Sequence, residues 1–237
     1  MKKEQKQILF TLISGVSIGL AAIGFWVYVS QNEKKLVIKT PFFEMNVDFI
    51  GRHIKDGGMY LKRQKYELAK EKFNKAIALD SENIEALIGH CYANSMMKLY
   101  AEAIQDCSRV IQYDSNNLKA YGVRGGAYYE LKQFDSALKD LNRAIELNDE
   151  NETLFYNRGG VLNEMKQFEA SLDDMNRAIE LAPDEGLFYL SRSRVLANLK
   201  QYEKSLDDIK RARELGVEDP NLEFEAKLLK KLQAKNQ

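Results

Sequence analysis

The residues best suited to chemistry in this chain are one histidine and two cysteines. His90 and Cys91 are adjacent, and Cys107 follows later in the sequence. An imidazole and two thiolates are zinc ligands, but a structural zinc site needs four ligands and these three side chains lack the fourth. A disulfide is the other chemistry open to two cysteines. We expect buried, unreactive thiols instead, because equivalent positions elsewhere in the chain, Gly125 and Leu141, are small or apolar.

A column of arginines is the second candidate for chemistry, and it recurs every 34 residues. Its members are Arg124, Arg158 and Arg192. Such a ladder is a candidate site for an anionic ligand. Aspartates recur at the same interval, and they are Asp140, Asp174 and Asp208. In the earliest stretch the signs are exchanged, with Asp56 before Lys72. Exchange of both charges together favours ion pairs within the fold, and we predict pairs rather than an anion site.

Nothing else in the sequence points to catalysis. The glycine pairs 125–126 and 159–160 follow no strand and lack the Gly-Lys-Ser/Thr of a phosphate-binding loop. We therefore predict no enzyme activity, no catalytic residue, no metal and no cofactor. Lys and Arg together number 35 against 35 for Asp and Glu, which gives a net charge of +0. Nucleic acid is not an expected partner, because phosphate binding needs an excess of positive charge.

The elements that position these residues repeat at the same interval. One aromatic residue marks each repeat: Tyr66, Tyr100, Phe134, Phe168 and Tyr202. A period of this length is typical of helical hairpins that stack, because a single hairpin cannot bury its own apolar face. Five units follow one another without insertion, and together they fill 50–219. They are 50–83, 84–117, 118–151, 152–185 and 186–219.

Each of the five units resembles the tetratricopeptide repeat, and the third unit, 118–151, shows nearly all of its pattern. It carries the aromatic, small and aliphatic residues of that pattern, namely Tyr121, Gly125, Tyr128, Phe134, Ala137, Ala144 and Leu147. The resemblance implies an all-α superhelical solenoid of helix-turn-helix repeats. It also implies that Gly125 and Gly159 lie where two paired helices approach most closely. Residues 220–237 are predicted to form an amphipathic helix that caps the stack.

The resemblance also places the first helix of each repeat along a concave face that binds proteins. The residues expected there are Tyr92, Lys119, Gly122, Gly126, Tyr129, Tyr156, Asn157, Gly160, Asn163 and Arg194. They predict a groove for an extended peptide or a helix, and an ordinary solvated surface is the alternative. A clamp of Lys, Asn and Arg grips the C-terminal carboxylates of chaperones in some members of the family. Here only Lys119 matches that clamp.

The N-terminal part of the chain has a different character. Residues 8–30 contain no charge, and a helix of about 23 residues is about 34 Å long, enough to cross a bilayer core of about 30 Å. We predict a transmembrane helix there, after a basic flank at 1–7. Residues 31–49 are predicted to be a linker or a cap, in which residues 36–38 and 42–43 are candidates for a short strand around Pro41. A cleaved signal peptide is the alternative, but no cleavage motif follows Val29.

Two details of the predicted helix concern its neighbours. Gly15 and Gly19 form a GxxxG pattern, which allows weak self-association, although ordinary composition also explains it. Lysines flank both ends in equal number, so the side of the membrane is left open.

These patterns together predict a membrane protein with a single N-terminal span. Its expected role is a tetratricopeptide-repeat scaffold or adaptor that recruits a partner polypeptide to the membrane. The alternatives are a targeting receptor or co-chaperone, and a regulatory subunit of a membrane enzyme.

Overall fold

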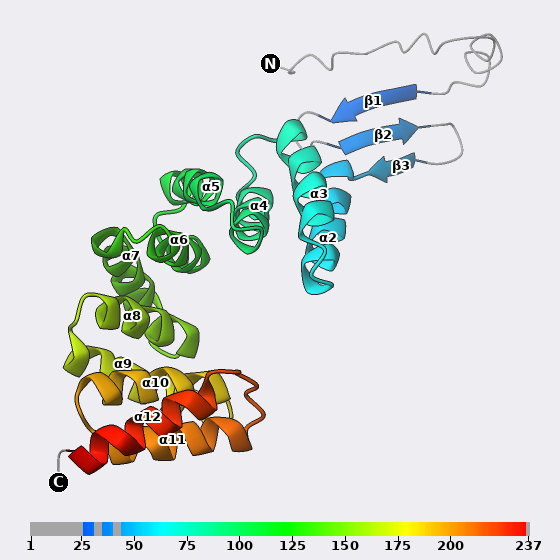
Figure 1. Ribbon diagram of the computed structural model, residues 1–237. Coiled ribbons are helices and arrows are strands. Elements are labelled where there is room, and N and C mark those ends of the chain that lie inside the picture. Colours follow the sequence, from blue (N-terminus) through cyan, green and yellow to red (C-terminus); the bar gives the residue numbers. More distant parts are fainter. Residues whose placement is uncertain (1–25, 31–34, 40–43, 236–237) are drawn as a thin grey trace. The chain divides into compact units, whose positions relative to one another are not determined.

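The computed structural model describes residues 26–30, 35–39 and 44–235. These residues form two compact units, one ending at Leu99 and the other beginning at Tyr100. From Phe49 to Lys235 every regular element is a helix, and Figure 1 shows the helices following one another as hairpins. The prediction of an α-helical repeat architecture is confirmed for this part of the chain.

The first unit contains a small antiparallel sheet. Its strands are β1 (Trp26–Ser30), β2 (Lys35–Lys39) and β3 (Glu44–Val47), paired in that order. The register places Val27 opposite Ile38, and Ile38 opposite Met45. The expectation of an all-α chain is therefore wrong before Phe49. Of the candidate strand, residues 36–38 lie within β2, and residues 42–43 lie outside the described residues.

The sheet also changes the expected boundary of the membrane segment. Of the predicted helix at 8–30, the last residues, Trp26–Ser30, are strand β1. The hydropathy of these residues shows that they are apolar. It does not show that the β-branched residues among them can pair with residues 36–38 as neighbouring strands. The rest of the predicted span, 8–25, and the flank at 1–7 lie outside the described residues. Within the described part, no helix combines the length and apolar composition needed to cross a membrane.

The helices of the first unit are α2 (Phe49–Lys62), α3 (Tyr66–Leu79) and α4 (Ile84–Met96). They close around Phe73, which is 2% exposed. A Cβ atom on Gly57 or on Gly89 would overlap the Phe73 ring, so both glycines are needed for α2 and α4 to pack against it. The small residues thus set how closely these helices approach.

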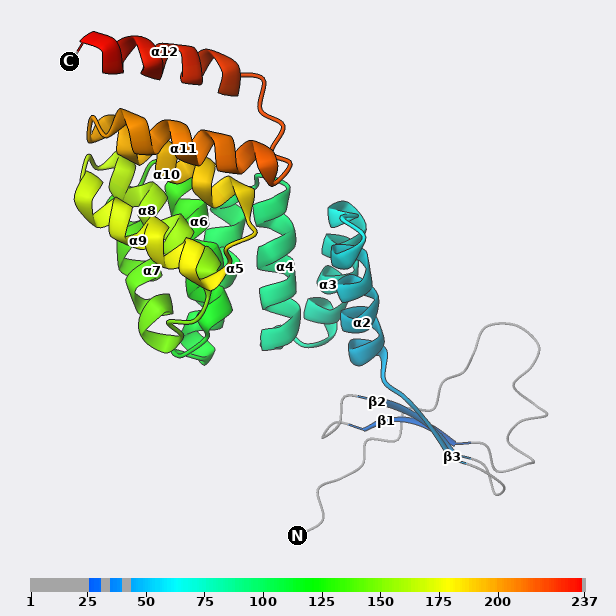
Figure 2. The same cartoon turned by 90° about the horizontal axis from the view of Figure 1, so that it is seen from below.

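The second unit is a stack of helices (Figure 2). It contains α5 (Tyr100–Tyr113), α6 (Leu118–Glu130), α7 (Phe134–Leu147), α8 (Glu152–Glu164), α9 (Phe168–Leu181), α10 (Gly186–Asn198), α11 (Tyr202–Glu214) and α12 (Leu222–Lys235). The hairpins are α6 with α7, α8 with α9 and α10 with α11, while α12 packs on α11. The first helix α8 also contacts the first helices α6 and α10 on either side of it, so the three share one face of the stack.

Two recurring devices delimit these helices. The side chains of Asn83, Asn117 and Asn151 cap first helices by accepting a backbone N–H bond, for example Asn117 from Ala120 at 3.1 Å. In the turn of each hairpin one residue adopts a left-handed conformation with φ between 56° and 61°. These residues are Gln64, Lys98, Lys132, Lys166 and Lys200. Each turn therefore reverses the chain without a glycine.

The hairpins close at the small residues that the sequence indicates. A Cβ atom on Gly125 would lie 2.9 Å from Cγ of Leu141, and one on Gly159 would lie 2.9 Å from Cε of Met175. The hydroxyl of Ser171 donates a 2.7 Å hydrogen bond to the carbonyl oxygen of Gly159. The predicted close approach at Gly125 and Gly159 is confirmed, and the serine adds a hydrogen bond that an alanine would not make.

The two cysteines are buried, as expected, but they are not free thiols. Cys91 and Cys107 are each 0% exposed, and each is disulfide-bonded. The expectation of unreactive thiols is therefore wrong. A position in a repeat predicts whether a side chain is buried, but oxidation depends on whether two sulfur atoms come within bonding distance, and sequence spacing does not fix that distance.

Candidate functional site

The arginine column is occupied by internal partners. Arg158 donates from Nε to Oδ2 of Asp174 at 2.7 Å and from Nη2 to Oδ1 at 2.6 Å. The remaining Nη1 donates to Oδ1 of Asn142 at 2.9 Å. The same two-pronged contact joins Arg124 to Asp140 and Arg192 to Asp208.

These pairs lie inside the stack. Asp140, Asp174 and Asp208 are 3%, 5% and 6% exposed. Hydrogen bonding to Asp174 raises the pKa of Arg158 and outweighs the opposing effect of burial. In the first unit the reversed pair also forms, with Nζ of Lys72 3.7 Å from Oδ2 of Asp56. The prediction of structural ion pairs is confirmed.

The third bond of each arginine was not foreseen from the sequence. Its acceptors are Ser108, Asn142 and Asn176, which lie on the second helix of the preceding repeat. Each arginine therefore ties two successive repeats together as well as the two helices of its own hairpin. The sequence did contain a pattern from which these bonds could have been predicted, because the three acceptor residues also recur every 34 residues.

A cleft with a volume of about 330 Å³ opens along the first helices of the second unit. Its walls come from α6, α8 and α10, with one residue from α9. The lining residues are Gly126, Tyr129, Glu130, Tyr156, Asn157, Gly160, Asn163, Glu164, Met175, Ser191, Arg194 and Val195. Both aromatic and polar side chains converge on this space.

Most of the residues predicted for the groove meet in this cleft. They are Gly126, Tyr129, Tyr156, Asn157, Gly160, Asn163 and Arg194. The other three lie elsewhere: Tyr92 on α4 of the first unit, Lys119 in the exposed first turn of α6, and Gly122 against α8. A Cβ atom on Gly122 would lie 3.2 Å from Cδ2 of Leu154, so this glycine serves helix packing. Binding by the cleft residues stays a prediction.

Two glycines leave open space in the cleft. A Cβ atom on Gly126 would meet nothing within 4 Å. One on Gly160 would lie 3.9 Å from the Tyr129 ring, which is ordinary van der Waals contact. Neither glycine is therefore required by the packing of the stack, in contrast to Gly125 and Gly159.

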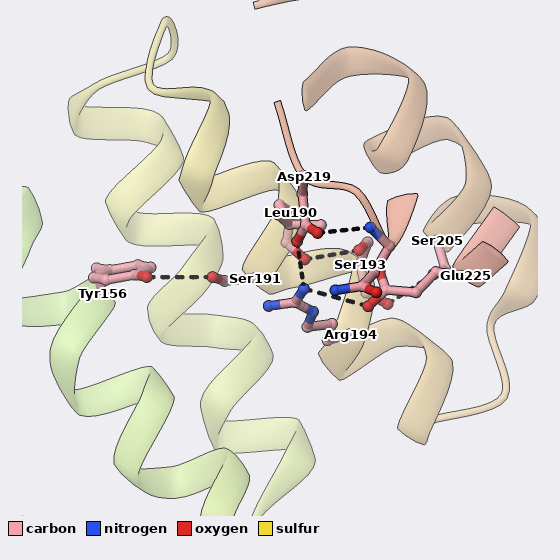
Figure 3. Close-up of polar contacts among 9 residues, drawn as sticks. Tyr156, Leu190, Ser191, Ser193, Arg194, Ser205, Asp219 and Glu225 are labelled. Carbon is pink, nitrogen blue, oxygen red and sulfur yellow. Dashed lines mark hydrogen bonds and ion pairs between the residues drawn. The ribbon is translucent and has the colours of Figure 1, made fainter. Parts of the chain in front are cut away.

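The two tyrosines are held in place by their neighbours. The Tyr156 ring stacks on Phe188 with centroids 5.0 Å apart and planes inclined by 29°. Its hydroxyl accepts a long, 3.5 Å hydrogen bond from Ser191 on the adjacent helix (Figure 3). The Tyr129 ring lies 6.1 Å from that of Phe134. Rings fixed in this way offer a ligand firm contact surfaces at little cost in side-chain entropy.

Arg194 lines the cleft, but it already has partners. Figure 3 shows its guanidinium turned toward Asp219 and Glu225, and Nη2 lies 3.1 Å and 3.2 Å from their carboxylate oxygens. Its side chain is 48% exposed. The groove prediction included Arg194 without these partners, which come from the connection to α12 and from α12 itself.

Two glutamates in the lining were not among the residues predicted for the groove. Glu130 and Glu164 are the last residues of α6 and α8. Burial raises the pKa of Tyr129, and the charges of Glu164 and Glu130 raise it further. Both carboxylates therefore act on the phenol from nearby. Their spacing of one repeat was the available signal, since it gives them equivalent places on successive first helices.

Metal chemistry has no candidate in the part of the chain that the structure describes. No group of three or more His, Cys, Asp or Glu side chains is arranged there to hold a metal ion.

Comparison with known families agrees with the geometry of the hairpins. A family model described as TPR repeat matches residues 125–165, and one described as tetratricopeptide repeat matches residues 153–185. Together the two models match residues 125–185, where the chain is similar to tetratricopeptide repeats. The matched stretch contains α8 and α9 and much of the cleft lining. No curated protein sequence matches the chain.

Solved structures extend the likeness beyond the matched repeats. The pilF protein of Pseudomonas aeruginosa is 20% identical with a TM-score of 0.69, over 79% of this chain and 86% of that chain. A MamA protein is 20% identical with a TM-score of 0.60, over 70% and 91%. YrrB, described as a TPR protein with an unusual peptide-binding site, is 22% identical with a TM-score of 0.59, over 74% and 90%. At these identities the likeness shows a shared tetratricopeptide-repeat fold.

Proposed function

We propose that the chain is a tetratricopeptide-repeat scaffold whose cleft between α6, α8 and α10 holds an extended segment of a partner polypeptide. The observation that carries this proposal is the open space beside Gly126 and Gly160, in a cleft that the fixed rings of Tyr129 and Tyr156 also line. A cleft of about 330 Å³ also falls in the range of about 300–1,000 Å³ typical of ligand sites.

The glycines support the proposal because each of them destabilises its helix. A glycine inside a helix is about 1 kcal/mol less favourable than alanine. Packing accounts for Gly125 and Gly159, but Gly126 and Gly160 have no such reason. Close approach of a ligand backbone to the helix surface would offset the penalty. Such approach suits an extended segment, and Asn157 has an amide with which to bond a peptide group.

One neighbour in structure adds support for a peptide ligand. YrrB is described as having an unusual peptide-binding site, and it shares this chain's fold at 22% identity. The residues of that site do not carry over at this identity, but peptide binding is a use to which the fold is put.

The proposed site of action is the surface of a membrane. The chain would recruit its partner polypeptide to that surface. Residues 8–25 remain without charge when Trp26–Ser30 are assigned to β1. A helix of about 18 residues is about 27 Å long, close to the bilayer core of about 30 Å. This apolar length supports an N-terminal anchor.

Blocking the cleft tests the proposal. In the full chain in native membranes, Gly126→Leu combined with Gly160→Leu should abolish crosslinking of the partner, measured by quantitative mass spectrometry. Thermal stability should be preserved, because both positions have room for a side chain. Gly58→Leu is the matched control, since a Cβ atom there also meets nothing within 4 Å and Gly58 has the same place in its repeat. Undiminished crosslinking by the double variant would refute the cleft assignment.

A further inference from the structure

The charges around the cleft are unbalanced. Glu130 and Glu164 line it, and within the described part of the chain neither is ion-paired with a cation. Arg194 is the cation of the lining, and it already contacts Asp219 and Glu225. Glu130 accepts a 3.2 Å hydrogen bond from the hydroxyl of Tyr100, which brings no positive charge. An incoming ligand therefore meets two carboxylates that, within the described residues, are not ion-paired.

The helix ends add to this negative potential. Glu130 and Glu164 are the final residues of α6 and α8. The carbonyl groups at a helix C-terminus carry a partial negative charge, equivalent to about half an elementary charge. A carboxylate at that place is unfavourable to the helix, whereas a cation is favourable. Two first helices thus end with acidic residues where a cationic ligand would relieve the repulsion.

Aromatic faces lie beside these carboxylates. Tyr129 precedes Glu130 on α6. Burial raises the pKa of the Tyr129 phenol, and the negative charges of Glu164 and Glu130 raise it further. Tyr156, which is eight residues before Glu164 on α8, lines the same cleft and stacks on Phe188. The face of an aromatic ring attracts a cation, and the attraction is stronger when the cation is desolvated.

We propose that the cleft selects a polypeptide segment with a lysine or arginine side chain, whose cation lies between Glu130 and Glu164 against the ring of Tyr129. The proposal rests on the proposed function and specifies the chemistry of the partner. The backbone of the segment passes over Gly126 and Gly160, and its basic side chain points to the C-terminal ends of α6 and α8. An acidic segment is disfavoured there, because it would place like charges together.

Selection from a display library of random short peptides tests this chemistry. The full chain in detergent micelles is the target, and the variant with leucine at Gly126 and Gly160 removes peptides that bind elsewhere. Peptides specific to the cleft should be enriched in lysine and arginine. Changing the basic residue of an enriched peptide to glutamine should weaken its binding about tenfold.

Variants of the two glutamates locate the effect. In Glu130→Gln combined with Glu164→Gln, the same peptide change should alter binding by less than about twofold. Glu169→Gln, on the exposed first turn of α9, should behave as the unaltered chain does. Cleft-specific peptides without a basic bias would overturn this inference and leave the proposed function standing. The absence of any cleft-specific peptide would overturn both.

Discussion

Asp174 and Lys72 occupy equivalent places in their repeats, yet their surroundings differ. Asp174 is 5% exposed and receives two hydrogen bonds from Arg158. The side chain of Lys72 is 25% exposed and lies 3.7 Å from a carboxylate oxygen of Asp56. Removing one partner of a buried pair leaves an uncompensated charge, whereas an exposed charge is solvated by water.

The two positions should therefore respond differently to alanine. Asp174→Ala should lower the free energy of unfolding by about 3 kcal/mol, the lower end of the range for buried pairs because Arg158 retains some access to water. Lys72→Ala should lower it by about 0–1 kcal/mol. Urea unfolding in detergent, followed by circular dichroism, measures both. Equal and small losses would show that the buried pairs are not structural and would reopen the arginine column as an anion site.

Adjacent glycines on α6 offer a second contrast. Gly126→Ala should raise the free energy of unfolding by about 1 kcal/mol, because the methyl group meets open space and alanine favours the helix. Gly125→Ala should lower it, because the new Cβ atom would lie 2.9 Å from Leu141. Thermal melts of the two variants test the contrast. A destabilised Gly126→Ala would mean that this glycine has a packing role and would remove the main support for the cleft.

Single residues could be predicted from the sequence where two sets of positions, one basic and one acidic, recur at the same interval and change sign together. The exchange of signs between Asp56–Lys72 and Arg158–Asp174 identified the ion pairs. The contrast of Gly125 with Gly126 followed from helix geometry, which turns neighbouring residues to different faces. The pairing of Arg194 with Glu225 did not follow, because Glu225 lies beyond the last repeat and has no register with it.

At the scale of elements, the hairpin turns contain backbone strain, which the repeat pattern of the sequence does not show. Lys166 has a φ of 60°, in the left-handed region that costs most residues about 1–2 kcal/mol. Lys166→Gly should therefore raise the free energy of unfolding by about 0.5–1 kcal/mol, after the greater freedom of glycine in the unfolded chain is included. Lys139→Gly, in the middle of α7, should lower it by about 1 kcal/mol. If urea unfolding shows both variants destabilised alike, the turn is unstrained.

The elements themselves were predictable to different degrees. The constant 34-residue interval predicted the helical hairpins between Phe49 and Glu214, because each unit repeats the same apolar faces. Strand β1 was missed, since an apolar stretch such as 8–30 satisfies the length criterion for a membrane helix whether or not its end pairs with another strand. Strand pairing depends on a second strand elsewhere in the chain, and the residues of that strand lie outside the window over which hydropathy is averaged.

For the whole molecule, the open question of location has a direct test. If residues 8–25 anchor the chain, alkaline carbonate extraction of native membranes should leave the full-length protein in the pellet, because an inserted apolar helix is not released by high pH. A variant that lacks 8–25 should appear in the supernatant. Full-length protein in the soluble fraction, or a mature N-terminus after residue 20, would show that the anchor is absent or removed.

The central claim is that a partner polypeptide lies in the cleft between α6, α8 and α10, and site-specific photocrosslinking tests it most directly. A photoreactive amino acid replaces Asn157 inside the cleft or Lys139 on the exposed side of α7 in the full chain. After illumination of native membranes, we predict a discrete crosslinked polypeptide from position 157 and none from position 139. Crosslinks of equal yield from both positions, or from position 139 alone, would contradict the account.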